Sequence, residues 1–237
     1  MPLAVFMILG TLQLFMILQG RIMAEYAAFR ATRVGSTNQG ECQAMTDAAL
    51  VALMPTYNSF LGPGTPGGTP GEKLANAYAM RRTNRYAGAR DAGHTGSIVW
   101  VIRERPLRFT IPSREDVEWD APGNLMRLET RLVYWFPLRI PFANWVVSRM
   151  YLASFGLMTY TAMNPLMPAQ KQGDTNWEQT SSITLAPEII NEIIDRYNRS
   201  PAEYVLPIQA SSTMRMMSPA KASFFTTQNC PPAPETL

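Results

Sequence analysis

The sequence predicts an α+β protein. A long N-terminal helix, transmembrane in its first half, is followed by a small globular domain with a mainly antiparallel sheet and covering helices. Three patterns support this prediction. Residues 1–20 contain no charged side chain. Residues 128–135 alternate with a two-residue period, which is typical of a half-buried strand. Residues 187–198 carry isoleucines at helical spacing, which is typical of an amphipathic helix.

The composition allows a buried core but does not indicate a partner. Of the 237 residues, 46% are hydrophobic and 16% are charged, against about 25% charged in an average globular protein. This excludes wholesale disorder and a polytopic channel. The net charge of +3 is too small to select a partner. Two cysteines and one histidine exclude a disulfide-dense scaffold and any four-thiolate or multi-histidine metal centre.

Residues 1–20 are long enough to form a transmembrane helix, because 20 helical residues reach about 30 Å, the thickness of a hydrocarbon core. The alternatives are a cleaved signal peptide and a buried helix of a soluble protein. A signal peptide needs a basic segment before the apolar run and a small-residue cleavage site after it. The sequence shows neither, so we expect a retained membrane helix.

The helix is expected to continue beyond the span, because residues 21–34 are good helix formers without proline. Gly35 and Gly40 predict a break near residues 35–40, and residues 41–54 are again helix-like. The predicted organisation is an N-terminal transmembrane and extended helix (1–54), a Gly/Pro-rich linker and irregular segment (55–96), an α+β globular domain (97–228) and a disordered tail (229–237).

The Gly/Pro-rich stretch 61–73 predicts a loop and not a nucleotide site. Residues 62–67 match the G-x-G-x-x-G spacing of a dinucleotide-binding motif, but two prolines lie inside the match and no strand precedes it. Neither Ser nor Thr follows Lys73, as a phosphate-binding loop would require. We expect no cofactor.

The globular domain is expected to combine short strands with covering helices. Pro137 and Pro141 should end the longest strand and turn the chain. A second membrane helix within the uncharged residues 150–170 is an alternative that their Gly, Asn and Pro disfavour. The expected strands are 97–103, 107–111, 125–136, 204–208 and 211–217, and the expected helices are 142–158 and 187–198.

Three segments, in order, carry a family resemblance. The apolar run opens with Pro2-Leu3 and leads into an arginine-rich helix that contains Gly20-Arg21, Tyr26 to Ala31 and Arg33 to Ser36. Residues 131–142 have the pattern of a strand followed by a Pro-Leu-x-x-Pro turn, and residues 210–216 that of a closing strand. Together they resemble TadE/TadG-like pseudopilins, which are minor components of tight-adherence (Flp-type) pilus assembly.

The resemblance implies a structural protein of the bacterial inner membrane. A single helix would anchor it, and the C-terminal domain would lie in the periplasm or at the cell surface. Its partners would be other pilus-assembly pseudopilins, inner-membrane platform proteins and membrane lipid. Gly10 and Gly20 would allow close approach of neighbouring helices in the membrane.

The charges around the span bear on its orientation. Arg21, Arg30 and Arg33 follow the span and no basic residue precedes it, so the positive-inside rule alone would place the C-terminal part in the cytoplasm. Family members usually begin with a basic leader, a cleavage-site glycine and a nearby glutamate; Glu25 lies too far along to be that glutamate. We therefore expect a start codon upstream of Met1, the alternative being an unprocessed membrane-held relative.

His94 is the one histidine, and it lies in a Gly-rich loop between Asp91 and Ser97. These residue types could form a nucleophilic triad only if they converged beside an oxyanion hole, and no Gly-x-Ser-x-Gly elbow is present. We expect a solvated histidine and no enzymatic activity.

An acidic run at residues 116–120 has the alternating carboxylates that begin a calcium loop. The sixth position of such a loop should be Gly and the twelfth Glu, whereas the sequence has Ala121 and Arg127 there. We expect a charged turn.

Arginines are concentrated in residues 81–114, which hold eight of them against two acidic residues. An anion-binding patch would meet DNA, anionic lipid or acidic polysaccharide. No nucleic-acid-binding fold signature accompanies it, so we expect a solvated surface and no nucleic-acid partner. The candidate residues are Arg81, Arg82, Arg85 and Arg90.

Cys42 and Cys230 could form a disulfide if the domain is exported. The alternative is one buried thiol and one tail thiol, since the sequence does not give their separation.

Three functions are consistent with these patterns. The first is a pseudopilin that caps, initiates or decorates a pilus. The second is a membrane-anchored exported binding protein unrelated to pili, using the arginines or an apolar groove. The third is a tethered hydrolase using His94.

Overall fold

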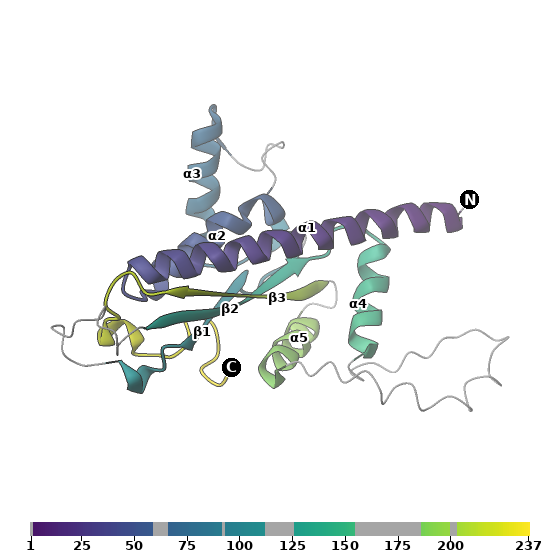
Figure 1. Cartoon of the computed structure of the whole chain (residues 1–237). Coiled ribbons are helices and arrows are strands. Elements are labelled where there is room, and N and C mark those ends of the chain that lie inside the picture. Colours follow the sequence, from purple (N-terminus) through teal and green to yellow (C-terminus); the bar gives the residue numbers. More distant parts are fainter. Residues whose placement is uncertain (1, 59–65, 92, 112–125, 155–185, 200–202) are drawn as a thin grey trace, which may run out of the picture.

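Helix α1 (Pro2–Thr37) runs along the folded domain and extends beyond it (Figure 1). It has 36 residues, which corresponds to a length of about 54 Å. The computed structural model describes residues 2–58, 66–91, 93–111, 126–154, 186–199 and 203–237. They form an α+β fold with a three-stranded antiparallel sheet and helices on both of its faces, as the sequence predicts.

The predicted break after the first helix lies at residues 38–41. Gln39 and Gly40 adopt left-handed backbone conformations, with φ of 59° and 83°, which reverse the chain. Helix α2 (Cys42–Tyr57) therefore packs back against the second half of α1, with a buried face that includes Met45, Leu50 and Leu53. The sequence predicted the helices and the break between them, but not that α2 doubles back.

The sheet has the strand order β1-β2-β3. Strands β1 (Val99–Arg105), β2 (Arg127–Pro137) and β3 (Val205–Arg215) are antiparallel neighbours, with Val101 paired to Leu132 and Leu132 to Ala210. The two strands expected at 204–208 and 211–217 are one continuous strand.

The strand expected at 107–111 is wrong. The 3-10 helix η2 (Arg108–Thr110) lies there. Pro106 has no N–H to donate to a strand ladder, and the backbone N–H of Arg108 donates to the Gln228 side chain at 2.8 Å. Both features end strand pairing before this segment.

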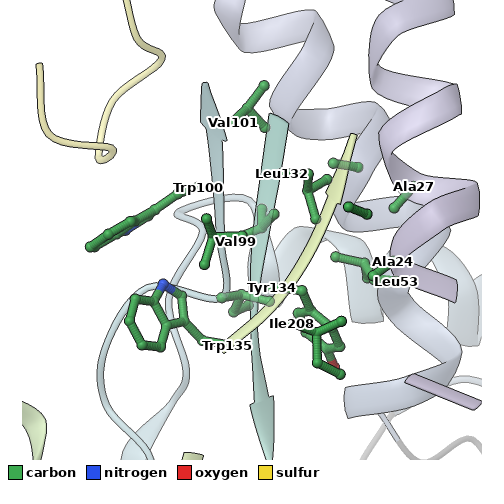
Figure 2. Packing of buried hydrophobic residues seen from close by; sticks show 14 of the residues in the cluster. Ala24, Ala27, Leu53, Val99, Trp100, Val101, Leu132, Tyr134, Trp135 and Ile208 are labelled. Atoms are coloured by element: carbon green, nitrogen blue, oxygen red, sulfur yellow. The ribbon is translucent and has the colours of Figure 1, made fainter. Parts of the chain in front are cut away.

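One face of the sheet packs against a row of alanines on α1. These alanines are spaced i, i+3, i+4 and i+7, so they lie on one side of the helix, and each is at most 1% exposed. Their small side chains let the α1 backbone approach the sheet closely. Figure 2 shows two of them beside Leu132, Tyr134 and Ile208. The row, called the alanine face below, consists of Ala24, Ala27, Ala28 and Ala31.

The opposite face of the sheet is covered by helix α5 (Pro187–Arg199), which buries Ile189 and Ile193. The sequence predicted that this face of β2 would be more exposed to solvent than the other face. Glu129 and Arg131 are indeed half-buried, but Trp135 is fully buried. Its ring meets Trp100 edge-on at a centroid distance of 4.9 Å.

Two segments, one expected to be helical or irregular and one expected to be a disordered tail, have defined structure. Helix α3 (Pro70–Arg81) begins at a capping box between Thr69 and Glu72, and the 3-10 helix η1 (Gly88–Asp91) follows. The C-terminal residues also differ from the expected disordered tail. After η3 (Ala222–Phe225), the N–H of Cys230 donates to the carbonyl of Val101 at 3.0 Å, which fixes the tail beside β1.

We predict that Gly20→Leu destabilises the domain. A Cβ at Gly20 would lie 2.7 Å from Cδ2 of Phe136, whereas a Cβ at Gly10 would meet nothing within 4 Å. Overpacking of this kind costs about 1–3 kcal/mol, so the free energy of unfolding in detergent should fall by about that amount. Gly10→Leu is the matched control and should unfold at or above the wild-type midpoint. Equal midpoints for the two variants would contradict the packing of Gly20 on the sheet.

Candidate functional site

The first half of α1 presents apolar side chains that no other described part of the chain covers. Eight of them are between 41% and 66% exposed, and an apolar surface of this extent marks a contact with a membrane or another protein. The helix is long and apolar enough to cross a membrane, with a mean hydropathy of 1.6. The eight residues are Val5, Phe6, Met7, Ile8, Leu12, Leu14, Phe15 and Leu18.

The exposed apolar surface continues along α1 after the charge-free run ends. Leu18, Ile22, Tyr26 and Phe29 follow one another at helical spacing, and each is between 42% and 59% exposed. They lie on the side of the helix away from the alanine face. The second half of α1 therefore has one side on the sheet and one unpartnered apolar side.

The domain first contacts α1 within the charge-free run and not after it. The N–H of Ile140 donates to Oε1 of Gln13 at 3.1 Å, and the Gln13 side chain is fully buried. Met16 and Ile17 are partly buried and pack against the core. The Oε1 atom of Gln13 thus has its hydrogen-bond partner in the folded domain, whereas Nε2 has none among the described residues.

The two glycines predicted for packing in the membrane have different surroundings. Gly10 is open on its Cβ side, so it is available for close approach of another helix. Gly20 is buried and faces Phe136 and Ile208. The role predicted for Gly20 is therefore wrong: the close approach it permits is to the sheet of its own chain.

Cys42 and Cys230 form a disulfide, with their Cα atoms 5.1 Å apart. It joins the first residue of α2 to the C-terminal segment across 188 residues of sequence. Arg103 fastens the same region, because its guanidinium donates to the carbonyls of Gly40, Phe224, Thr227 and Gln228. The turn after α1 and the C-terminal segment are thus held together.

The predicted arginine patch is only partly at the surface. Arg81 is 4% exposed and makes two hydrogen bonds of 2.5 Å to the Asp91 carboxylate, so it is not available to an anion in solution. Arg82 and Arg85 are exposed. The side chain of Arg90 lies outside the described residues. A patch of all four arginines is therefore wrong, because a buried guanidinium needs a buried carboxylate beside it.

His94 is buried, which corrects the expectation of a solvated loop histidine. It is 1% exposed and lies against Tyr86 at a centroid distance of 5.8 Å. Its Nδ1 has no hydrogen-bond partner among the described residues. Burial, reinforced by the positive charge of Arg139, lowers the pKa of His94 to about 4, so the imidazole is neutral at pH 7.

The three residues weighed as a triad do not act together. The Asp91 carboxylate accepts from Arg81 and from the N–H of Ala87. The Ser97 hydroxyl accepts from the indole of Trp100 at 2.8 Å and from Arg196 at 3.1 Å. Both potential partners of His94 are thus occupied in fastening other elements, and this arrangement provides no activated nucleophile.

Arg196 is a buried residue whose role the sequence analysis missed. It is 1% exposed, pairs with Glu192 at 2.7 Å and Glu203 at 3.4 Å, and lies over the ring of Trp135 at 4.4 Å. The i, i+4 spacing of Glu192 and Arg196 suggests only a surface pair. The signal that could have found it is its spacing: Arg196 follows Ile189 by seven residues and Ile193 by three, which puts it on the same side of the helix as these two buried isoleucines.

No metal site is seen within the part of the chain that the structure describes: no three His, Cys, Asp or Glu side chains there could hold an ion together. The acidic run at 116–120, weighed as a calcium loop, lies outside the described residues, as does most of the uncharged stretch 150–170. The exposed apolar side of α1 is therefore the feature of the described residues that most directly indicates a function.

Comparison with protein-family models, with curated proteins and with solved structures finds no match to this chain. The resemblance to TadE/TadG-like pseudopilins accordingly depends on the sequence motifs, and the function is argued below from the structure together with those motifs.

We predict that replacing both cysteines by serine lowers the free energy of unfolding by about 4–5 kcal/mol, the chain-entropy value for so long a loop. The measurement is urea unfolding of the purified chain, with limited proteolysis to show release of the C-terminal segment. Mass spectrometry of a non-reduced digest is the control. Two free thiols in the exported wild-type protein would contradict the disulfide.

We predict that His94 makes the domain less stable in acid. Its pKa is about 4 when folded against 6.5 for an unperturbed histidine, so the unfolded chain binds the proton first. Stability is then lost as the pH falls below about 6.5 and levels off below about 4, by roughly 3 kcal/mol in total. The carboxylates also titrate in this range, so the comparison is with His94→Phe, which should show a smaller pH dependence. An unchanged pH dependence in that variant would refute the assignment.

Proposed function

We propose that this protein is a minor pseudopilin-like structural component of tight-adherence pilus assembly, anchored in a bacterial inner membrane by the first half of α1. The observation that carries the proposal is the double use of one helix. The first half of α1 exposes apolar side chains on all sides except at a few domain contacts, and the second half packs its alanine face on the sheet.

The unpartnered apolar side of the second half of α1 supports assembly with other subunits. A membrane anchor alone would need an apolar surface only along the span, whereas this stripe continues past Arg21 to Phe29. Helices of other pilus components could cover it, and the open Gly10 would let them approach closely. No catalytic group is required for such a role.

The disulfide supports a location of the domain outside the cytoplasm. Structural disulfides persist in oxidising compartments, including the bacterial periplasm, and this one joins α2 to the C-terminal segment. We therefore favour a periplasmic or surface-exposed domain over the orientation that the arginines after the span would suggest.

The exported binding protein remains the alternative function. It draws less support from the structure, because Arg81, the first residue of the arginine patch, is engaged with Asp91.

We predict that deleting the gene in its own bacterium removes or shortens surface pili, and that the full chain stays in the membrane fraction after alkaline carbonate extraction. Complementation with Gly10→Leu should give a folded, membrane-bound protein that restores pili poorly, since only lateral helix packing is altered. Normal pili in the deletion strain would contradict the pilus proposal, and recovery of the intact chain in the aqueous fraction would contradict the anchor.

A further inference from the structure

The turn at residues 138–142 is held in place by three different elements. The N–H of Leu138 donates to the carbonyl of Tyr204 at 2.9 Å, the Arg139 guanidinium donates to the carbonyl of Tyr57, and the N–H of Ile140 donates to Gln13 of α1. These contacts with the start of β3, the end of α2 and the apolar run of α1 fix the level along α1 at which helix α4 (Ala143–Ser154) begins.

This level lies inside the segment that inserts into the membrane under the proposed function. Gln13, which accepts this contact, stands seven residues before the end of the charge-free run at Gly20. The rest of the charge-free run, to Gly20, is alongside the domain. It cannot enter hydrocarbon unless the turn and the start of α4 reach the bilayer with it.

Helix α4 has the orientation and the surface of a helix that lies on a membrane. It starts beside α1 and runs across the direction of α1 (Figure 1), so it would lie along the membrane surface when α1 enters the bilayer. The outer side of α4 carries Trp145 and Met150, which are 46% and 64% exposed, and Phe142 in the turn before it is 75% exposed. The one charged residue of α4, Arg149, lies over the rings of Trp145 and Tyr197.

Phe142 gives a second indication that this surface has a partner. Its backbone has φ of 65°, a left-handed conformation that is costly for a bulky residue and that would suit Gly or Asn better. The ring is nevertheless 75% exposed, so burial inside the described chain does not explain a phenylalanine there. Backbone outliers of this kind concentrate at functional contacts.

We propose that α4 and the turn before it form an interfacial membrane contact, with Phe142, Trp145 and Met150 among the lipid headgroups and upper acyl chains. The proposal depends on the membrane insertion of α1 under the proposed function. The lipid bilayer is chosen as the occupant because α4 and the turn before it contact the charge-free run of α1, which inserts under the proposed function. Trp is enriched at this depth because its ring is apolar and its N–H is polar. The contact would set how deeply α1 inserts and how the domain is oriented.

The test uses the oxidised full-length chain in vesicles of phosphatidylethanolamine and phosphatidylglycerol. Nitroxide labels are attached to single cysteines introduced as Phe142→Cys, Met150→Cys and Phe109→Cys. Phe109 is 82% exposed and lies in η2, near the opposite end of the sheet, so it is the matched aqueous control. The ratio of collisions with oxygen to collisions with a water-soluble nickel chelate should be higher at positions 142 and 150 than at 109.

A second variant distinguishes a loss of membrane contact from a loss of folding. In the Phe142→Asn/Trp145→Gln background, the collision ratio at position 150 should fall toward that at 109. The variant should remain folded, because Asn suits the left-handed backbone at 142 and Trp145, whose ring contacts Arg149, is 46% exposed.

The outcomes separate the two proposals. Labels at 142 and 150 that are as accessible to nickel as the label at 109, in a chain that resists carbonate extraction, would overturn the interfacial role of α4 and leave the anchor intact. Labels shielded from both reagents would also overturn it, in favour of a protein partner. A chain that does not remain with the vesicles would overturn the anchor itself.

Discussion

The close packing of the alanine face of α1 on the sheet is the contact on which the rest of the structure depends. Side chains no larger than a methyl group, at 24, 27, 28 and 31, bring the helix near Leu132 and Ile208, and larger ones would force it away. Because this side of the helix supplies the core, the other side remains free. One continuous helix can thus belong to the domain and also carry an exposed apolar surface, without a flexible joint between the two parts.

The two ends of this helix–sheet contact are secured by different chemistry. At one end, the Cys42–Cys230 disulfide and the guanidinium of Arg103 join the turn after α1 to the C-terminal segment. At the other end, hydrogen bonds from the 138–142 turn reach α1, α2 and β3. The first end lies well beyond Arg21, at the turn between α1 and α2. The second end includes Gln13, in the charge-free run, whose Oε1 accepts from the N–H of Ile140.

The sequence predicted the features that local patterns determine. The long helix, the two-residue period of β2 and the helix predicted at 187–198 follow from which side chains avoid water, and each is present. The sequence did not predict which residues distant in the chain come into contact. Arg81 is buried because Asp91 folds back onto it, and Trp135 is buried because α5 covers that face. Gly20 was rightly expected to permit a close approach, but periodicity alone does not tell whether the neighbour is another helix or the sheet of the same chain.

The excess of arginine, 18 against three lysines, has a structural explanation in this domain. Arg81 makes two hydrogen bonds to one carboxylate, Arg103 donates to four carbonyls, and Arg196 lies over the ring of Trp135 and pairs with two glutamates. Each arrangement uses the planar, five-donor guanidinium in a way that an ammonium group could not reproduce. A three-stranded sheet is small, so the helices and turns that cover it also cover polar groups at its margins. A side chain that satisfies several acceptors at once allows those segments to pack over these groups. The arginines that looked like a surface for anions are thus, in part, the groups that join the sheet to its covering segments.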